Sequence, residues 1–308
     1  MIMTKPTLPL ELLRGKFGDA VRENVSLARY TSARIGGPAD LMVTVHSAQE
    51  LADVAGLLMA EALDFIVLGG GSNVLVSDLG VRQVVILNRA KAVKFHAGDS
   101  PRVHAESGAT FSQLGHRAAT KGFAGLEWAA AVPGSVGGAV YGNAGAFGGD
   151  VQAGLIQTEL LTDQGRATRT VTEMGYGYRT SVLKRGELKA VVLSAEFGLK
   201  NATKAEASAK IAQFSADRKA AQPPGASMGS MFKNPAGDHA GRLIEAAGLK
   251  GARIGSAEIS TLHGNFFINH GKTTASDIRA LIDLARKTVK EHSGVELELE
   301  IELVGEWK

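Results

Sequence analysis

The 308-residue sequence contains no cysteine. This absence excludes disulfide bonds, thiolate metal sites and cysteine nucleophiles, and it is compatible with a reducing compartment. The eight histidines never fall into HExxH or a comparable ligand spacing, so the sequence gives no support for a metal site. We therefore expect neither a disulfide scaffold nor a metalloenzyme.

Long apolar runs are missing as well. No stretch approaches the ~20 apolar residues that a membrane-spanning helix needs, and the first residues, MIMTKP, lead into no apolar segment of the kind found in secretion signals. The 34 basic and 31 acidic residues are scattered, without a basic stripe that carries interleaved aromatic residues. We expect a soluble cytoplasmic protein that binds neither membranes nor nucleic acid.

Glycine, in contrast, is abundant, with 38 residues. The first cluster, LGGGSNVLV at 68–76, follows the apolar run at 65–67. Because glycine has no Cβ, such a loop can adopt positive φ and present successive amide N–H groups to one anion, which predicts a phosphate cradle. The alternative is a tight glycine-rich turn without a ligand.

Two common nucleotide-binding fingerprints do not fit this cluster. The third glycine of GxGxxG would fall at Val74, and no GK[ST] follows the glycines. The residues up to Val76 continue as a strand, so the loop joins a strand to a strand instead of opening a helix. The sequence therefore argues against a Rossmann fold.

A second cluster places seven glycines between Pro133 and Gly149. Each would cost a helix or strand interior about 1 kcal/mol, so we expect neither element there. A backbone with so few side chains predicts that a flat or anionic group passes close to it. The alternative is a plain glycine-rich loop.

The first part of the chain is predicted to form a β-α-β unit. Strands are expected at 41–45 and 65–68, and Ser47 with Glu50 forms a capping box for the helix between them. A further strand is expected at 83–87.

The rest of the chain separates into two more parts. From residue 91 short strands and loops dominate, with one helix that Thr110 and Gln113 cap. After Lys200 the sequence predicts helices at 203–219, 240–247 and 274–292 and strands at 266–269 and 295–304. We place three domains at 1–88, 89–202 and 203–308.

A few polar residues are candidates for chemistry. In GSMFKNP (229–235), Ser230 lies three residues before Lys233, although loops of this composition are commonly plain turns. Arg179 follows two tyrosines and has the fork geometry that binds a carboxylate or an enolate oxygen, although loop arginines are commonly solvated.

The predicted last strand alternates apolar residues with four glutamates at 296, 298, 300 and 302. Such residues project from one face at a spacing of about 7 Å. We expect three of them to face solvent. Neighbouring like charges are unfavourable unless cations lie opposite, so we expect Arg179 or Lys233 beside one glutamate.

Six stretches, taken in order, resemble the UDP-N-acetylenolpyruvoylglucosamine reductase family, flavoenzymes of peptidoglycan precursor synthesis. They are TSARIGGPAD (31–40), LGGGSNVLV (68–76), 125–149 with PGSVGGAVYGNAGAFGG, YRTS (178–181), GSMFKNP (229–235), and GLKGARIG with HGNFFIN within 248–269. The resemblance implies an α+β fold. Two FAD-binding subdomains of the vanillyl-alcohol-oxidase type, 1–88 and 89–202, would precede a C-terminal α+β substrate-binding domain, 203–308.

The resemblance also implies a reaction. NADPH would reduce non-covalently bound FAD, and hydride would then pass from flavin N5 to UDP-N-acetylglucosamine enolpyruvate to give UDP-N-acetylmuramate. Ser230 matches the proton donor, and Arg179 and Glu300 match the pair beside the substrate carboxyl. The transition state accumulates negative charge, which Arg179 and a protonated Glu300 would stabilise.

The same resemblance implies binding residues. The first glycine loop would hold the FAD pyrophosphate, and the second glycine stretch would run along the flavin. The predicted cofactor-binding residues are Gly69, Gly70, Gly71, Ser72, Asn73, Pro133, Gly134, Ser135, Gly138 and Asn143. The predicted substrate-binding residues are Lys233, Asn234, His263 and Asn265.

The chain departs from the family pattern at two points. Members with a long substrate-clamping loop use a tyrosine of the third domain, but all four tyrosines here precede Arg179. This indicates the shorter variant without that loop and leaves open what grips the UDP diphosphate, with His263 and Asn265 as candidates. A basic residue also commonly stands where this chain has Glu302.

Two alternatives stay open. The chain could be another FAD-dependent enzyme of the same fold that acts on a different alcohol or sugar, or a non-catalytic protein that binds nucleotide sugars. We expect the protein to be a monomer.

Overall fold

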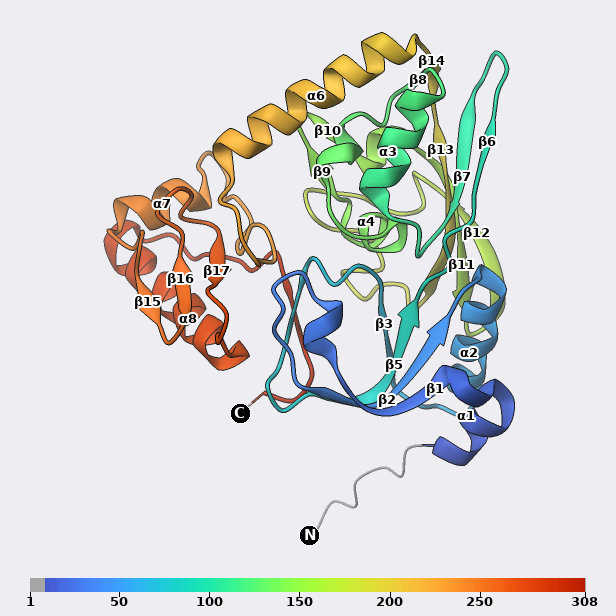
Figure 1. The fold of residues 1–308 in the computed structure, drawn as a ribbon, viewed down its shortest axis with the longest axis horizontal. Helices are drawn as coiled ribbons and strands as arrows, with labels where there is room; N and C mark the ends of the chain where they lie inside the picture. The colour runs from blue at the N-terminus through green and yellow to red at the C-terminus, as the bar shows by residue number, and fades with distance from the viewer. Residues whose placement is uncertain (1–8, 308) are drawn as a thin grey trace.

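The computed structural model describes residues 9–307. It contains two sheet-based parts and a C-terminal lobe, which one long helix joins to the rest (Figure 1). Within the described range, no helix is both long enough and apolar enough to cross a bilayer. The expectation about the first six residues concerns a segment outside this range.

The first part folds into a four-stranded sheet. Its elements are α1 (Leu10–Phe17), η1 (Gly18–Ala20), β1 (Val21–Ser26), η2 (Leu27–Tyr30), β2 (Pro38–Val45), α2 (Ala48–Ala60), β3 (Phe65–Leu68) and β5 (Val81–Asn88). The strand order is β1-β2-β5-β3, with β1 antiparallel to β2 and with β2, β5 and β3 parallel. Because α2 crosses over from β2 to β3, the predicted β-α-β unit is confirmed.

The second part is built on a five-stranded antiparallel sheet. Its strands, in the spatial order β12-β11-β13-β7-β6, are β6 (Val93–His96), β7 (Arg102–Glu106), β11 (Leu155–Thr162), β12 (Gly165–Thr170) and β13 (Val191–Gly198). The shorter elements are α3 (Phe111–Thr120), β8 (Phe123–Ala124), η3 (Trp128–Ala131), α4 (Val136–Gly142), β9 (Gly145–Ala146), β10 (Gly149–Asp150), α5 (Val151–Gly154) and β14 (Lys200–Asn201). The rings of Phe111, Trp128 and Phe197 pack together in the core of this part.

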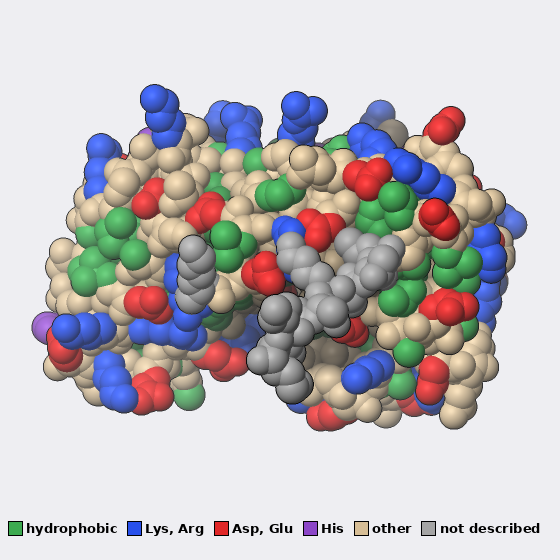
Figure 2. All heavy atoms as spheres, turned by 90° about the horizontal axis from the view of Figure 1, so that it is seen from below, with side chains coloured by type: hydrophobic (Ala, Val, Ile, Leu, Met, Phe, Trp, Pro, Cys, Tyr) green, Lys and Arg blue, Asp and Glu red, His purple; other side chains and the backbone are tan. Residues whose placement is uncertain are grey.

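Helix α6 (Lys204–Ala221) runs from the second part to the C-terminal lobe (Figure 1). The lobe contains α7 (Ala240–Ala246), β15 (Arg253–Ile254), β16 (Ala257–Ile259), β17 (Phe267–Asn269) and α8 (Ala275–Ser293), and its three strands form one antiparallel sheet. Seen from below, the surface is hollowed between this lobe and the rest of the molecule, and both basic and acidic side chains lie on this face (Figure 2).

The end of the chain returns from the lobe to the first part. Strand β18 (Glu302–Val304) pairs in parallel with β4 (Val74–Val76), which directly follows the first glycine loop. The C-terminal segment therefore ties the lobe to the first sheet region. The three domain ranges stay a prediction. Strand β18 lies in the third predicted range, 203–308, but it pairs with β4 of the first predicted range, 1–88.

The expectation that the second glycine cluster forms no helix is wrong. Helix α4 runs through it, and the hydroxyl of Ser135 caps the helix by accepting the backbone N–H of Gly138 at 3.4 Å. At Gly137 a Cβ would lie 2.9 Å from the Cβ of Ser107, and the Gly137 N–H donates to the Ser107 carbonyl at 2.7 Å. Close packing against Ser107 therefore requires glycine and compensates for its low helix propensity.

The predicted last strand is only partly correct. Regular strand structure is limited to β18, because the residues before it pair with the 229–235 loop of the lobe. The N–H of Glu300 donates to the Met231 carbonyl at 3.0 Å, and the N–H of Lys233 donates to the Glu298 carbonyl at 2.8 Å. The segment thus changes partners within a few residues, from the lobe to β4.

The predicted helix caps differ in detail. Ser47 accepts the N–H of Glu50 at 3.1 Å, but the Glu50 carboxylate accepts from His46 instead of completing the capping box. Thr110 makes no side-chain cap on α3. Complete capping boxes occur at the starts of α6 and α8.

The N-terminus of α8 is anchored on the first part. Asp78, which follows β4, accepts the backbone N–H groups of Ala275 at 2.8 Å and Ser276 at 2.9 Å, and its carboxylate also accepts the Ser276 hydroxyl at 2.7 Å. A negative charge at the start of a helix is favourable because the first N–H groups lack partners within the helix. This contact fixes the lobe close to the first glycine loop.

We expect Asp78→Ala to lower the free energy of unfolding of the FAD-loaded protein by about 1–2 kcal/mol, because three hydrogen bonds to one carboxylate are lost. Thermal or urea unfolding measures the change. The matched control is Asp99→Ala, an exposed aspartate between β6 and β7, which should leave the midpoint unchanged. Equal midpoints for the two variants would contradict the anchoring role.

Candidate active site

The two glycine clusters lie against each other. A Cβ on Gly70 would lie 2.6 Å from the Cα of Gly134, and a Cβ on Gly69 would lie 2.2 Å from the Ser135 Oγ. The hydroxyl of Ser72 donates to the Pro133 carbonyl at 3.2 Å. The glycines are therefore needed for the close approach of two loops that are about 60 residues apart in the sequence.

The first loop offers a row of free donors. Among the hydrogen bonds of residues 9–307, none uses the backbone N–H of Gly70, Gly71, Ser72 or Asn73. The guanidinium of Arg89 donates to the Gly69 carbonyl at 3.2 Å, which adds a positive charge beside the loop. Successive unpaired N–H groups form an anion-binding concavity, so these residues fit the diphosphate of a dinucleotide such as FAD.

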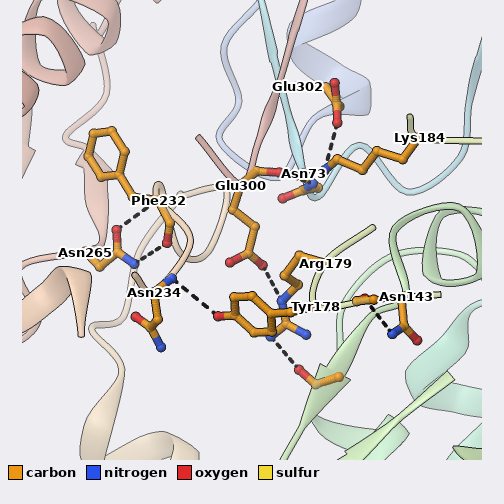
Figure 3. A network of polar contacts seen from close by, with 12 residues as sticks. Asn73, Asn143, Tyr178, Arg179, Lys184, Phe232, Asn234, Asn265, Glu300 and Glu302 are labelled. Carbon is orange, nitrogen blue, oxygen red and sulfur yellow. Dashed lines mark hydrogen bonds and ion pairs between the residues drawn. The ribbon is translucent and has the colours of Figure 1, made fainter. Parts of the chain in front are cut away.

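A partly buried ion pair joins the second part to the C-terminal segment (Figure 3). The Nε of Arg179 donates to the Oε1 of Glu300 at 2.9 Å, and its Nη2 donates to the Gly145 carbonyl at 2.8 Å. The guanidinium also lies over the ring of Tyr178, 5.3 Å from its centroid. Arg179 has a φ of 55°, a left-handed conformation that non-glycine residues rarely adopt. Such strained residues cluster at functional sites.

The surroundings of Glu300 favour the protonated form of its carboxyl group. Its side chain is only 17% exposed, and burial raises the pKa of Glu300 above its ordinary value, although the charges of Arg179, Lys184 and Lys233 act to lower that pKa. Desolvation disfavours the ionised carboxylate, while the nearby cations favour it. Because burial is the largest of these effects, Glu300 keeps its proton to a higher pH than a free glutamic acid.

The backbone of Glu300 connects all three parts. Its N–H donates to the Met231 carbonyl in the lobe, and its own carbonyl accepts from the Asn73 Nδ2 at 3.0 Å and from the Lys184 Nζ at 3.1 Å. Ser230 directly precedes Met231, is half-buried, and has a hydroxyl without a hydrogen-bond partner in the described part of the chain. The structure thus brings Arg179 and Glu300 into contact and places Ser230 on the segment that pairs with Glu300.

Each of the four C-terminal glutamates faces a cation. Glu300 pairs with Arg179, and the other three pair with Lys290 (Glu296), Lys233 (Glu298) and Lys184 (Glu302). These three side chains are at least 40% exposed. The expected solvent exposure of three glutamates is therefore confirmed, as are the expected neighbours Arg179 and Lys233.

The predicted substrate residues occupy different places. Lys233 pairs with Glu298, and the N–H of Asn234 donates to the Tyr178 hydroxyl at 3.4 Å, so both lie beside the Arg179 turn. Asn265 is buried, and its amide is fully engaged with the backbone of Phe232, at 2.9 Å from the N–H and 2.8 Å from the carbonyl. These two hydrogen bonds hold in place the 229–235 loop, which carries Ser230.

His263 lies inside the lobe. Its Nδ1 accepts the N–H of Asn265 at 3.1 Å, and its ring packs on Phe266 and against Gly241 of α7. Burial lowers the pKa of His263, which favours the neutral imidazole. The structure shows no contact between His263 and the Arg179 turn among the described residues.

Asn143 is likewise buried and engaged. Its side chain donates to the Gly177 carbonyl at 2.9 Å and accepts the N–H of Gln152 at 2.9 Å, so it holds the turn that carries Arg179. Ser135 caps α4, while Pro133 and Gly138 are exposed beside the first loop.

Two residues at this site, Tyr178 and Lys184, were not predicted as separate candidates from the sequence. Tyr178 was named only as part of the motif YRTS (178–181), and Lys184 lies three residues after the end of that motif. No periodicity or spacing marks a lone lysine as a partner of a carbonyl more than 100 residues away. A positive charge close after the YRTS turn is the only signal for Lys184.

Two regions of the chain match known protein families. Residues 39–170 match the family model described as FAD binding domain, and residues 219–304 match the C-terminal domain of UDP-N-acetylenolpyruvoylglucosamine reductase. Among solved structures, the reductase of that name from Thermus caldophilus superposes with a TM-score of 0.78 at 36% identity, covering 92% of this chain and 99% of that one.

Curated relatives with the same printed name extend over nearly the whole chain. The protein from Chloroflexus aggregans is 43% identical and covers 97% of this chain and 100% of its own length. The protein from Bacillus velezensis is 38% identical, with 96% and 98% covered. The predicted succession of an FAD-binding region and a C-terminal α+β domain is confirmed. This chain belongs to the UDP-N-acetylenolpyruvoylglucosamine reductase family.

Proposed function

We propose that this protein reduces UDP-N-acetylglucosamine enolpyruvate to UDP-N-acetylmuramate, with FAD as its bound cofactor and NADPH as the reductant. The observation that carries the proposal is the partly buried pair of Arg179 and Glu300 beside the Ser230 loop. The names of the relatives support the same reaction. The matching FAD-binding region supports the cofactor.

The glycine loops are proposed to hold the FAD. The free N–H groups of the 70–73 loop suit the diphosphate, and the exposed Pro133 and Gly138 lie on the adjoining stretch. The bound FAD would supply the redox chemistry by taking hydride from NADPH and giving it to the substrate. The protein's own share is to bind, to orient and to provide charge and a proton.

The polar residues take distinct proposed roles. Arg179 binds the substrate carboxylate through its fork of N–H donors, and a protonated Glu300 donates a hydrogen bond to the negative charge that develops beside it. Ser230, whose hydroxyl has no hydrogen-bond partner within residues 9–307, donates the proton to the neighbouring carbon. In a buried site such fixed groups act more strongly than in water.

The remaining assignments follow from the contacts. Lys233 and Asn234 lie next to the Arg179 turn and stay candidates for binding the nucleotide sugar. Asn265 and Asn143 are better described as holding the Ser230 and Arg179 loops in place, because their amides are already engaged. Among the described residues no hydrogen bond uses the Nε2 of His263, so this atom stays a candidate for binding a ligand. We further propose that the protein acts as a monomer in the cytoplasm.

The direct test of the proposed function is an absorption spectrum. The purified protein should show flavin absorption that NADPH bleaches, and adding the enolpyruvyl nucleotide sugar should restore the absorption without oxygen. A flavin that NADPH reduces but that this substrate leaves reduced would reject the proposed reaction. Bleaching of the flavin by a simple alcohol as electron donor, followed by rapid reoxidation by O₂, would indicate a different enzyme of this fold.

We expect Gly70→Ala to weaken FAD binding by about 10- to 100-fold, since the overpacking that a new Cβ causes against Gly134 typically costs about 1–3 kcal/mol. Titration of the apoprotein with FAD, followed by flavin fluorescence, measures the affinity. Gly56→Ala in α2, where a Cβ meets nothing within 4 Å, is the matched control. A Kd equal to that of this control would argue against a tight glycine cradle.

For Ser230→Ala we expect unchanged bleaching by NADPH and a reoxidation by the enolpyruvyl substrate that is about 100-fold slower or more, the usual size of a general-acid contribution. Stopped-flow absorbance separates the two half-reactions. Ser215→Ala on the exposed face of α6 serves as the control. If both half-reactions slow equally, Ser230 is not the proton donor.

The raised pKa of Glu300 predicts the pH dependence of the substrate half-reaction. Burial favours the protonated carboxyl, so the rate should be constant at low pH and fall as the pH rises through this pKa. In Glu300→Gln the rate should be lower and this fall should be absent, because an amide does not ionise. A rate that instead increases as Glu300 ionises would show that the carboxylate is the active form.

A further inference from the structure

The Glu300 carbonyl is bound by two side chains from different parts of the molecule. The Asn73 Nδ2 approaches it to 3.0 Å from the first glycine loop, and the Lys184 Nζ approaches it to 3.1 Å from the second part (Figure 3). A carbonyl oxygen has two lone pairs, so both acceptor positions are used. The backbone of Glu300 is therefore restrained independently of its carboxyl group.

Lys184 is built into this place. Its side chain is 13% exposed, and its Nζ also contacts the Oε1 of Glu302 at 2.9 Å. Its backbone N–H donates to the hydroxyl of Ser181 at 3.2 Å, and that hydroxyl in turn donates to the Tyr141 carbonyl. The ammonium is thus held by protein oxygens on a turn that is itself fixed to α4.

The Arg179 turn therefore reaches Glu300 in two ways. Arg179 binds the carboxylate, and Lys184, five residues later, binds the carbonyl of the same residue. Two contacts on opposite ends of one residue define the direction in which its side chain points. An ion pair between Lys184 and Glu302 alone would not require the hydrogen bond from Lys184 to the Glu300 carbonyl.

We propose that Lys184 is a positioning residue for the reaction: by gripping the Glu300 carbonyl and the Glu302 carboxylate together, it holds the Glu300 side chain in register with Arg179 and the substrate. This inference rests on the proposed function. It assigns Lys184 no contact with the substrate and no proton transfer.

The charges around Glu300 give the proposal a second observable. Arg179 and Lys184 face it from the second part, Lys233 from the lobe, and Glu298 and Glu302 flank it on its own segment. Lys184 acts to lower the pKa of Glu300. Removing its charge should raise that pKa further, whereas neutralising Glu302 should lower it, because Lys184 would then be less compensated.

The test compares Lys184→Met, Lys184→Arg and Glu302→Gln in the FAD-loaded protein. Lys184→Met should slow the substrate half-reaction by about 10- to 100-fold, the size expected for a misplaced catalytic group, while bleaching by NADPH and the FAD affinity stay within about twofold. Lys184→Arg should recover most of the loss. Glu302→Gln should keep at least about a third of the rate, because the bond to the carbonyl remains.

Lys189→Met, an exposed lysine further along the same segment, controls for the loss of a positive charge and should behave like the wild type. An unchanged substrate half-reaction in Lys184→Met would overturn the proposal. An equal loss in both half-reactions together with weaker FAD binding would also overturn it, since this would show a purely structural role. A loss in Glu302→Gln as large as in Lys184→Met would assign the effect to the ion pair instead of the carbonyl.

The ionisation of Glu300 distinguishes this proposal from the proposed function. It can be followed by carbon NMR in protein with labelled glutamate, with Glu300→Gln to assign the signal. The pKa of Glu300 should rise in Lys184→Met, fall in Glu302→Gln and stay unchanged in Lys189→Met, whatever the substrate is. A pKa that is the same in all of these proteins would contradict the placement of Lys184, even if the enzyme reduces the proposed substrate.

Discussion

The site depends on one residue, Glu300, being held by every part of the chain at once. Its carboxylate meets Arg179 of the second part, its N–H meets the Ser230 loop of the lobe, and its carbonyl meets Asn73 of the first glycine loop. This ion pair is largely withdrawn from solvent, with side chains 24% and 17% exposed, and contributes little net stability because desolvation offsets much of the attraction. Its value here is geometric: the three parts must be assembled before the acid and the arginine meet.

The same segment connects the loop proposed to hold the cofactor to the residues proposed to bind the substrate. Asn73 ends the loop whose N–H groups are free for a diphosphate, and β18 continues from Glu300 into a pairing with β4 directly after that loop. The Asn73 side chain donates to the Glu300 carbonyl, and the Asn73 carbonyl accepts the N–H of Glu302 at 2.9 Å, so the loop and the Glu300 segment are joined by two hydrogen bonds. Asp78 and α8 fix the lobe to the same region from the other side. Binding of the dinucleotide and orientation of the acid share one framework.

Local sequence signals predicted much of this arrangement. The β-α-β unit followed from the expected strands at 41–45 and 65–68 and from the Ser47 cap, and the direct strand exit after Asn73 argued correctly against a Rossmann fold. Helix α4 was missed because propensity alone counts glycine as a breaker, whereas close packing of Gly137 on Ser107 decides the outcome. The last strand was predicted too long because its alternating pattern cannot reveal that the partner changes from the Ser230 loop to β4. The roles of Lys184, Asn143 and Asn265 depend on carbonyls and N–H groups distant in sequence, which no spacing rule encodes.

The central claim is that Arg179, Glu300 and Ser230 converge on one reacting group. The most direct measurement is a crystal structure of the FAD-loaded protein with the enolpyruvyl nucleotide sugar bound. We predict that the substrate carboxylate lies within hydrogen-bond distance of Arg179 and Glu300, with the Ser230 hydroxyl facing the carbon beside it. A substrate bound elsewhere, or turned so that its carboxylate meets neither Arg179 nor Glu300, would contradict the account.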